Sequence, residues 1–379
     1  MKRRSIRLAL SLISAGLILL YFVAVFQSHQ KQQELLLHES PSSSFRKNNR
    51  NVEQQQSPDS IVTTSMVGKT KVVAFCNYNF RSLAVVWYDR MTRLGYTTHT
   101  IVATDDNMVK FLQEYNANIQ ARASENNIEY RNGRRRIRYD VMIHEPLPDK
   151  HANKPQTKKD HLVLELLMAV RWKYLLEQLR QGIHVLLTDV DNIFMYHYDP
   201  LSLADKDSIK VDVWHAYATK YPRRTYGVQG FVVCSGMSWW RSTQASIEYA
   251  TLMHQACNTM CDDQRVLNVL IEQQLQIKWS VNASDSSLPT RISSETESDP
   301  RFIGLMTQSI EGTSNRIPGL TVKVWDRDFA FRGPLYPQPS CPKNVWVSMP
   351  ILEAPSRGKA WATKVESFKQ WDEYCTAAS

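Results

Sequence analysis

The sequence predicts an α/β fold with a mostly parallel central sheet. Short apolar runs alternate with helical patterns from residue 70 onward, and this alternation is typical of parallel strands joined by right-handed crossovers. The apolar run at residues 183–188 ends in Asp189 and Asp191, one residue apart. Because side chains at the carboxyl ends of strands face the ligand crevice of an open α/β sheet, we expect a binding site there.

The first half of the globular region contains strand and helix patterns in turn. Strand-length apolar runs are found at residues 72–76, 99–104 and 183–188. Helical periodicity is found at residues 81–94, 107–115 and 162–180. Gly95 and Gly182 follow two of these helices, as helix-ending glycines do. The second strand leads into Asp105 and Asp106.

The pattern is weaker in the second half. Residues 227–238 are punctuated by glycine and rich in strand formers, and residues 239–254 predict a helix. Residues 261–264, Cys-Asp-Asp-Gln, predict the start of another helix, where carboxylates interact favourably with the helix dipole. A strand pattern resumes at residues 322–331. We find no internal repeat and no glycine-rich phosphate loop.

The N-terminus predicts a membrane anchor. Four basic residues within residues 1–7 precede residues 8–26, which contain no charged side chain. Nineteen residues at about 1.5 Å each span roughly 28 Å, close to the roughly 30 Å of a bilayer core. The flanking basic residues favour a cytoplasmic N-terminus. A cleaved signal peptide is the alternative, although its apolar region is usually shorter.

The chain therefore divides into four expected parts. They are a cytoplasmic tail at residues 1–7, a transmembrane signal anchor at 8–26, a flexible stem at 27–69 and a globular lumenal domain at 70–379. The stem is rich in Gln, Ser and Asn and has too few large apolar residues to form a core.

The net charge of +9 is spread unevenly along the chain. Residues 1–69 hold nine Lys/Arg and four Asp/Glu, a net of +5, which leaves +4 for the globular part. That mild excess favours anionic ligands but is no nucleic-acid signature. The five arginines within residues 131–138 predict a solvated loop, with contact to an acidic glycan as the alternative.

The cysteines permit disulfides in an oxidising compartment. Their fifteen possible pairings remain open, among Cys76, Cys234, Cys257, Cys261, Cys341 and Cys375. Cys257 and Cys261 can lie one helical turn apart, but no second Cys/His pair completes a zinc site. Asn282, followed by Ala and Ser, is the expected glycosylation site.

The aspartate pair predicts a metal site. Two carboxylates are costly to desolvate unless a positive group joins them. The natural partner is Mn²⁺ or Mg²⁺, held by oxygen ligands and shared with a substrate phosphate. The alternative is that Asp189 and Asp191 only cap the turn that follows the strand.

Four motifs together resemble a known enzyme family. They are VVAFCNYNF at residues 72–80, the helix–Gly–strand–Asp-x-Asp unit at 171–191, GVQGF at 227–231 and DQRVLN at 263–268. Their order and spacing are similar to those of the plant and algal Golgi glycosyltransferases that include rhamnogalacturonan-II xylosyltransferases and extensin arabinosyltransferases. The resemblance covers about residues 72–272.

This resemblance implies a GT-A fold, Rossmann-like with a mostly parallel central sheet, and a single-pass type II Golgi membrane protein. It implies transfer of xylose, arabinose or galactose from a nucleoside diphosphate donor, such as a UDP-sugar, with retention of anomeric configuration. The acceptor would be a glycan or glycoprotein. Nothing in the sequence separates these sugars or identifies the acceptor.

The resemblance also assigns roles to individual residues. Metal and diphosphate would be bound by Asp189 and Asp191, with Asp189 also near the ribose. The nucleoside would lie near Asn77 and Asp105, the diphosphate near Arg171 or Lys173, and the sugar's reactive face near Asp263 and Gln264.

The sequence departs from the family near the C-terminus. Relatives often place a late His there as a further metal or diphosphate ligand, but no His follows His254 in this chain. The corresponding stretch is residues 346–350, Trp-Val-Ser-Met-Pro. Lys359 or Lys364 could compensate for the diphosphate charge.

A cation near the leaving group would assist the reaction, because the diphosphate gains negative charge as the glycosidic bond breaks. Retention requires a carboxylate nucleophile or same-face attack through an oxocarbenium-like state. Asp263 could serve either route, and Gln264 could position hydroxyl groups. The alternative for Asp263 is that it only caps its helix.

Two other functions remain open at this stage. A haloacid-dehalogenase-type phosphatase also carries Asp-x-Asp after an apolar strand, although that fold normally begins with this strand. A membrane-tethered carbohydrate-binding protein or inactive transferase homologue is the non-enzymatic alternative.

Overall fold

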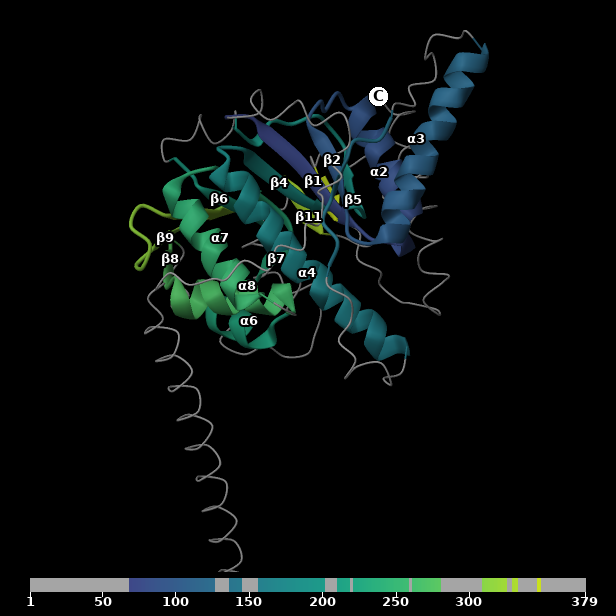
Figure 1. Cartoon of the computed structure of the whole chain (residues 1–379). Coiled ribbons are helices and arrows are strands. Elements are labelled where there is room, and N and C mark those ends of the chain that lie inside the picture. Colours follow the sequence, from purple (N-terminus) through teal and green to yellow (C-terminus); the bar gives the residue numbers. More distant parts are fainter. Residues whose placement is uncertain are drawn as a thin grey trace, which may run out of the picture. The chain divides into compact units, whose positions relative to one another are not determined.

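The computed structural model describes residues 68–126, 136–144, 156–201, 210–218, 221–258, 261–280, 309–325, 329–332 and 346–348. Within these ranges, nine strands form a large sheet in the order β3-β2-β1-β4-β7-β6-β10-β9-β8 (Figure 1). Three more form a small sheet in the order β11-β12-β5.

The strands of the large sheet are, in that order, β3 (Tyr139–Val141), β2 (His99–Ala103), β1 (Thr70–Cys76), β4 (His184–Asp189), β7 (Val233–Trp240), β6 (Val213–Tyr217), β10 (Thr321–Val324), β9 (Ile310–Ser314) and β8 (Ile277–Trp279). Those of the small sheet are β11 (Ala330–Arg332), β12 (Trp346–Ser348) and β5 (Asn192–Phe194). The helices are α2 (Arg81–Arg93), α3 (Asp106–Asn126), α4 (Gln156–Arg180), α6 (Arg223–Gln229), α7 (Gln244–Ala256) and α8 (Asp263–Val269). Short 3-10 and π-helical turns occupy Tyr78–Phe80 and Leu270–Gln274.

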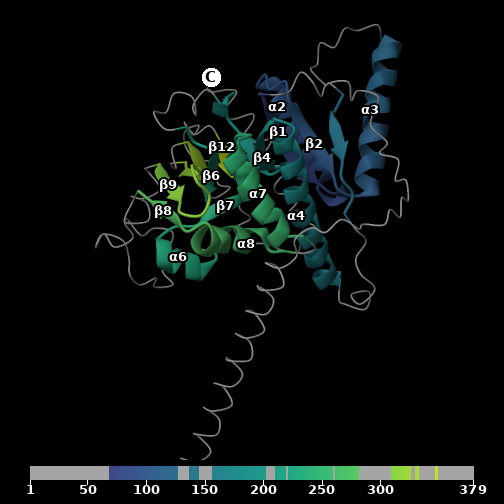
Figure 2. The same ribbon diagram turned by 60° about the vertical axis from the view of Figure 1, so that its left-hand side comes forward.

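The large sheet is mostly parallel, as the sequence predicted. Strands β3, β2, β1 and β4 are paired in parallel, and β7 and β9 run opposite to the other seven strands. Strands β1, β2 and β4 are almost wholly buried, as expected of a sheet covered on both faces. Figures 1 and 2 show α4 and α7 side by side against the sheet, with α8 next to them.

Strand register brings the expected polar residues to one edge. Phe75 of β1 pairs with Asp189 of β4, and Cys76 pairs with Ala103 of β2. Asn77 and Asp105 follow these strands directly or after one residue. The carboxyl ends of the three central parallel strands therefore lie at the same level, where a ligand crevice is expected.

The small sheet brings a distant segment next to the Asp-x-Asp turn. Strand β5 begins at Asn192, directly after Asp191, and β12 pairs with it antiparallel, so that Ser348 lies opposite Asn192. Residues 346–348 are the stretch in which the family resemblance implies a late ligand. The backbone places this stretch beside the aspartate turn.

A cluster of tryptophans packs helix α4 against the large sheet. The fully buried rings of Trp172, Trp214, Trp239 and Trp240 come from α4, β6 and β7. Trp172 meets Trp240 edge-on at 5.8 Å between centroids, and Trp214 meets Trp239 at 6.0 Å. Such pairs contribute beyond their buried area, so α4 and the sheet form a rigid support.

Several boundaries differ from the sequence prediction. Trp239 and Trp240 belong to β7 and not to the helix that was predicted for them. Both side chains are fully buried in the core against the sheet. Gly227 lies within α6, which ends at Gly230 with a left-handed φ of 77°. Helix α3 continues to Asn126, and α4 begins at Gln156. Residues 322–331 hold the end of one strand and part of another.

The last two residues of the predicted stem, Gly68 and Lys69, are described and bond to the backbone of Gly182 and His184. Several other predicted features lie outside the described residues: the anchor, the rest of the stem, Asn282, Lys359, Lys364, Cys341, Cys375 and most of the arginine run. In the ranges that are described, no helix combines the length and apolar character that a bilayer crossing needs.

Candidate active site

Asp189 and Arg171 form the centre of the site. Asp189 ends β4, and its side chain is 45% exposed. Arg171 of α4 is buried, and its Nη1 lies 3.0 Å from Oδ1 of Asp189. A second guanidinium nitrogen, Nη2, donates to the Ser235 carbonyl at 2.9 Å. The helix thus supplies a fixed positive charge beside an aspartate that a ligand can reach.

Gly236 allows the carboxylate to lie where it does. A Cβ atom at this position would be 2.2 Å from Oδ2 of Asp189, so any larger residue would displace the carboxylate. The sequence prediction did not single out Gly236. A glycine inside a strand pattern often marks a close approach of another group, and this signal could have identified it.

The Asp-x-Asp turn is held against β7 by Asn192. Its side-chain amide donates to Thr188 Oγ1 at 2.9 Å and to the Gly236 carbonyl at 3.1 Å. Asp191 is half-buried in the two-residue turn between β4 and β5. The predicted pair of aspartates therefore lies at the strand end on a fixed backbone.

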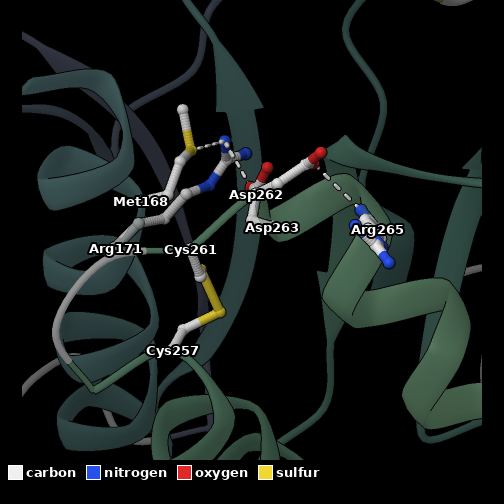
Figure 3. Close-up of a disulfide and its surroundings, with 7 residues drawn as sticks. All are labelled: Met168, Arg171, Cys257, Cys261, Asp262, Asp263 and Arg265. Carbon is white, nitrogen blue, oxygen red and sulfur yellow. Dashed lines mark hydrogen bonds and ion pairs between the residues drawn. A yellow bond between two sulfur atoms is a disulfide. The ribbon is translucent and has the colours of Figure 1, made fainter. Parts of the chain in front are cut away.

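Asp263 lies next to this pair, at the first residue of α8. Its Oδ2 is 3.9 Å from Nη1 of Arg171, the nitrogen that also contacts Asp189. Figure 3 shows Asp263 pointing toward Arg171 while Asp262 points toward Arg265. Asp262 is the N-cap: its side chain accepts from the Arg265 N–H at 3.1 Å. The alternative that Asp263 only caps the helix is therefore wrong.

Burial makes Asp263 electrostatically unusual. The residue is 7% exposed, and Oδ2 has no hydrogen-bond partner among the described residues. Burial raises the pKa of this carboxyl from 3.8 to about 6, and Asp189 adds to that rise. Arg171 and a hydrogen bond with Ser235 oppose it. A perturbed carboxylate beside a ligand-accessible one is typical of active sites.

Gln264 and Asn268 hold α8 against the start of β7. The Gln264 carbonyl oxygen accepts from the backbone N–H of Ser235 at 3.0 Å and from its hydroxyl at 3.1 Å. Its amide nitrogen donates to the Val233 carbonyl at 2.5 Å. Asn268 bonds both backbone groups of Val233 at 3.0 Å. The Gln264 side chain thus contacts protein groups and fixes the helix that carries Asp263.

Asn77 and Asp105 lie at the neighbouring strand ends. Asp105 accepts from the backbone N–H of Tyr78 at 2.8 Å and of Met108 at 2.7 Å. Asn77 accepts from the Asn79 N–H at 3.1 Å. Both side chains shape the loop after β1. On that loop the exposed Tyr78 ring lies 4.1 Å from the Arg81 guanidinium, an aromatic surface that the sequence prediction missed.

Lys173 does not join this cluster. It is exposed on α4, two residues from Arg171, and its charge acts on His254 of α7. Residues two apart on a helix point in different directions. Of the two basic residues expected near the diphosphate, the structure therefore places Arg171 in the site and Lys173 outside it.

The two aspartates suit a divalent cation that is shared with substrate. They offer hard oxygen ligands, which Mn²⁺ and Mg²⁺ prefer, and Asp189 is accessible. Among the described residues, no group of three or more His, Cys, Asp or Glu is arranged to hold a metal. The arrangement fits an ion that completes its coordination with phosphate and water.

A disulfide joins Cys257 and Cys261 just before α8. The sequence left the pairing of the cysteines open. Cys76 and Cys234 are buried thiols, and burial raises the pKa of Cys76 well above its ordinary value.

The fold and this cluster define an α/β enzyme with its ligand site at the carboxyl ends of parallel strands. The family model described as nucleotide-diphospho-sugar transferase matches residues 95–296, more than half of the chain. The chain belongs to this family and is a glycosyltransferase, which excludes the phosphatase alternative.

Solved glycosyltransferase structures are also similar to the chain. The galactosyltransferase LgtC, solved with donor and acceptor sugar analogs, is 14% identical, with 81% of this chain and 95% of that chain covered and a TM-score of 0.37. The bifunctional glycosyltransferase WbbM is 8% identical over 82% of this chain and 51% of its own, with a TM-score of 0.38. Apo GlyE of Streptococcus pneumoniae TIGR4 is 11% identical over 80% and 63%, with a TM-score of 0.36. No curated protein matches the sequence.

Proposed function

We propose that the protein is a retaining GT-A glycosyltransferase that moves xylose, arabinose or galactose from a UDP-sugar to a glycan or glycoprotein. The observation that carries this proposal is the sharing of one buried guanidinium, Arg171, by an accessible carboxylate, Asp189, and a buried one, Asp263. The four sequence motifs support the narrower assignment to the rhamnogalacturonan-II xylosyltransferase and extensin arabinosyltransferase group.

The donor diphosphate would lie at the Asp-x-Asp turn. Asp189 and Asp191 would hold Mn²⁺, or alternatively Mg²⁺, which when bound would stabilise the negative charge of the departing diphosphate. Arg171 keeps Asp189 in place through its 3.0 Å ion pair. Because Arg171 is buried, we assign it to orientation of the carboxylates and not to direct contact with phosphate.

The nucleoside would lie over the loop after β1. Asn77 and Asp105 fix this loop through hydrogen bonds to its backbone. The exposed Tyr78 ring offers a flat apolar surface on which a base can stack. This position lies along the same strand-end edge as Asp189, because β1 pairs with both β2 and β4.

The reacting carbon of the sugar would lie near Asp263. Positive charge develops at the anomeric carbon as the diphosphate leaves, and a buried carboxylate stabilises that charge more strongly than an exposed one. Asp263 could act as nucleophile or as electrostatic support for same-face attack. Gln264 would fix the position of the Asp263 carboxylate, because its hydrogen bonds hold α8 against β7.

The membrane and compartment assignments follow from the sequence. A signal anchor at residues 8–26 would place the catalytic domain in the Golgi lumen, with glycosylation at Asn282. The Cys257–Cys261 disulfide supports an oxidising compartment.

A donor screen tests the proposal. The full-length protein in detergent is incubated with UDP-xylose, UDP-arabinose and UDP-galactose in the presence of Mn²⁺, and UDP release is measured. We expect one donor to be turned over, with retention seen by NMR in the transferred sugar. Donor binding without turnover of any sugar would favour an inactive homologue and would refute the proposed activity.

A further inference from the structure

The junction between α7 and α8 is covalently closed. Cys257 is the C-cap of α7, and its backbone N–H donates to the Met253 carbonyl at 3.0 Å. Cys261 lies two residues before Asp263. The disulfide brings the two Cα atoms to 5.1 Å, and both cysteines are buried. Figure 3 shows the disulfide below Asp262 and Asp263, near Arg171.

Helix α7 gives this disulfide a firm anchor. Its inner face, which includes Tyr249, Ala250 and Met253, is fully buried. The Tyr249 ring lies 4.7 Å from that of Trp240 in the sheet core. A capping box, in which Thr243 and Ser246 bond reciprocally, fixes the other end of the helix. The end of α7 is therefore a fixed point in the fold.

Asp263 needs such a fixed point. Its carboxylate is buried beside the like charge of Asp189, and Arg171 and a hydrogen bond with Ser235 offset this only in part. Its Oδ2 has no hydrogen-bond partner among the described residues. Its ion pair with Arg171 is long, at 3.9 Å. A carboxylate in these surroundings gains solvation if it moves toward water, so the backbone must hold it in place.

The length of the closed loop argues against global stability as the main role of the disulfide. Cys257 and Cys261 are four residues apart in sequence. The entropic stabilisation by a disulfide grows with loop length and is smallest for such short loops. The main effect of the bond is therefore local: it fixes the path of the chain immediately before α8.

We propose that Cys257 and Cys261 are positioning residues for Asp263, whose disulfide keeps the carboxylate beside Arg171 and at the sugar-donor site. This inference rests on the proposed function of Asp263. Because Gln264 and Asn268 still bind α8 to β7 when the disulfide is open, the helix and the fold should remain. The chain at the very start of α8, from Cys261 to Asp263, should loosen.

The experiment compares the full-length wild type with the Cys257→Ser/Cys261→Ser variant. UDP release from the donor found in the screen gives kcat, and titration with the same donor gives Kd. We expect kcat to fall by at least about tenfold while donor Kd changes by less than about threefold. Backbone amide exchange should become faster at the start of α8 and stay unchanged in α7 and β7.

Reduction of the folded wild type provides the same test without mutation. Dithiothreitol passes two electrons to the bond, which yields two cysteine thiols and the cyclic disulfide of the reagent. Activity should fall and return on reoxidation, and the double variant should not respond to the reagent. A response of the double variant would assign the effect to other cysteines and would overturn the proposal.

Other outcomes are equally decisive. Wild-type kcat in the double variant, or a loss of kcat matched by a loss of donor affinity, would reduce the disulfide to a structural role. If the oxidised wild type turns over no donor, the proposed function fails by itself. Amide exchange then decides the positioning role, and unchanged exchange in α8 on reduction would overturn it.

Discussion

Asp189 and Asp263 contact the same guanidinium nitrogen of Arg171 but differ in solvent exposure. We assign them different roles because of this difference in exposure. Asp189 is half-exposed and suits a ligand that arrives from solvent, whereas Asp263 is buried. The same side-chain type therefore serves ligand binding in one case and charge stabilisation in the other. Each role can be tested by a single substitution.

Asp191→Ala should abolish transfer while the protein stays folded. Asp191 is half-buried in a turn and not in the core, so its removal should cost little stability. Loss of a metal ligand should cost several kcal/mol of transition-state stabilisation, at about 1.36 kcal/mol per tenfold in rate. UDP release and thermal unfolding are measured together, with Glu114→Ala on α3 as an exposed carboxylate control. Near-normal turnover in the folded Asp191→Ala protein would rule out the proposed metal site.

Asp263→Asn should inactivate the enzyme and stabilise it at neutral pH. The folded-state pKa of Asp263 lies above its unfolded value, at about 6 against 3.8. As pH rises from 3.8 to about 6 the unfolded state loses its proton first, so the free energy of unfolding falls. This loss amounts to about 3 kcal/mol above pH 6 at about 1.36 kcal/mol per pKa unit. The amide removes that penalty, and kcat should fall at least about a hundredfold.

Denaturant unfolding at two pH values checks the stability change. The Asn variant should be more stable than wild type at pH 7. The difference should be nearly gone below about pH 3, where the carboxyl is protonated in both the folded and the unfolded wild type. Equal stability at pH 7 would show that the carboxyl has an ordinary pKa. Wild-type turnover in the folded variant would exclude the proposed catalytic role.

Gly236→Ala should damage the site without a general loss of fold. The added Cβ would displace the Asp189 carboxylate, from which it would be only 2.2 Å away. Gly312→Ala is a matched control, because its Cβ would meet Ile277 at 2.4 Å on a strand outside the active site. We expect donor turnover per folded molecule to fall for Gly236→Ala, whereas Gly312→Ala should lower Tm with its turnover retained. Equal effects on turnover would show that the strain at Gly236 is not specific to the site.

At the scale of elements, the first half of the chain was more predictable than the second. The sequence predicted five elements of the first half: β1, β2, β4, α2 and α4. Apolar runs marked the strands, and helical periodicity ended at the expected glycines. The second half combines antiparallel β7 with short α6 and α8. A run such as Val233–Trp240 is buried on both faces and has no alternation, so periodicity could not separate strand from helix at Trp239 and Trp240.

The candidate site was predictable in part for the same reason. Two features could be recognised from the sequence alone: the aspartates at the end of a strand, and the Asp263–Gln264 pair before an apolar run. Their roles relative to one another depend on packing. Asp262 caps α8 through the Arg265 N–H, whereas Asp263 is buried and faces Arg171 of α4, and local sequence does not specify which aspartate takes which position. Gly236 became informative once the pairing of β4 with β7 brought it against the Asp189 carboxylate.

The buried His215 of β6 should lower the free energy of unfolding as the pH falls below 6.5. Burial lowers the pKa of His215 from 6.5 to about 3. Below pH 6.5 the unfolded state gains a proton that the folded state does not accept, so the free energy of unfolding decreases by up to about 1.36 kcal/mol per pH unit. In His215→Phe, the slope between pH 6.5 and 5 should be smaller by up to this amount. Denaturant unfolding at both pH values checks it, and an unchanged slope would mean that His215 protonates in the folded protein.

At the scale of the whole molecule, we predict a lumenal catalytic domain behind a single membrane anchor. The charge-flanked apolar segment at residues 8–26 motivates this topology. A C-terminal tag should be protected from protease on intact vesicles and digested after detergent is added. In a glycosylating host, Asn282→Gln should increase gel mobility. Digestion of the tag on intact vesicles would overturn the topology.

The pairing of β12 with β5 has a consequence for biosynthesis. The turn that carries Asp191 is followed by a strand whose partner, Trp346–Ser348, is made much later in the chain. Contacts between segments so far apart in sequence form late, because the intervening chain must first be ordered. Before the ribosome has added residues 346–348, the nascent polypeptide can complete its parallel β-sheet but not the strand pairing beside its aspartate turn. Competence for donor binding should therefore arise only after this segment has been made.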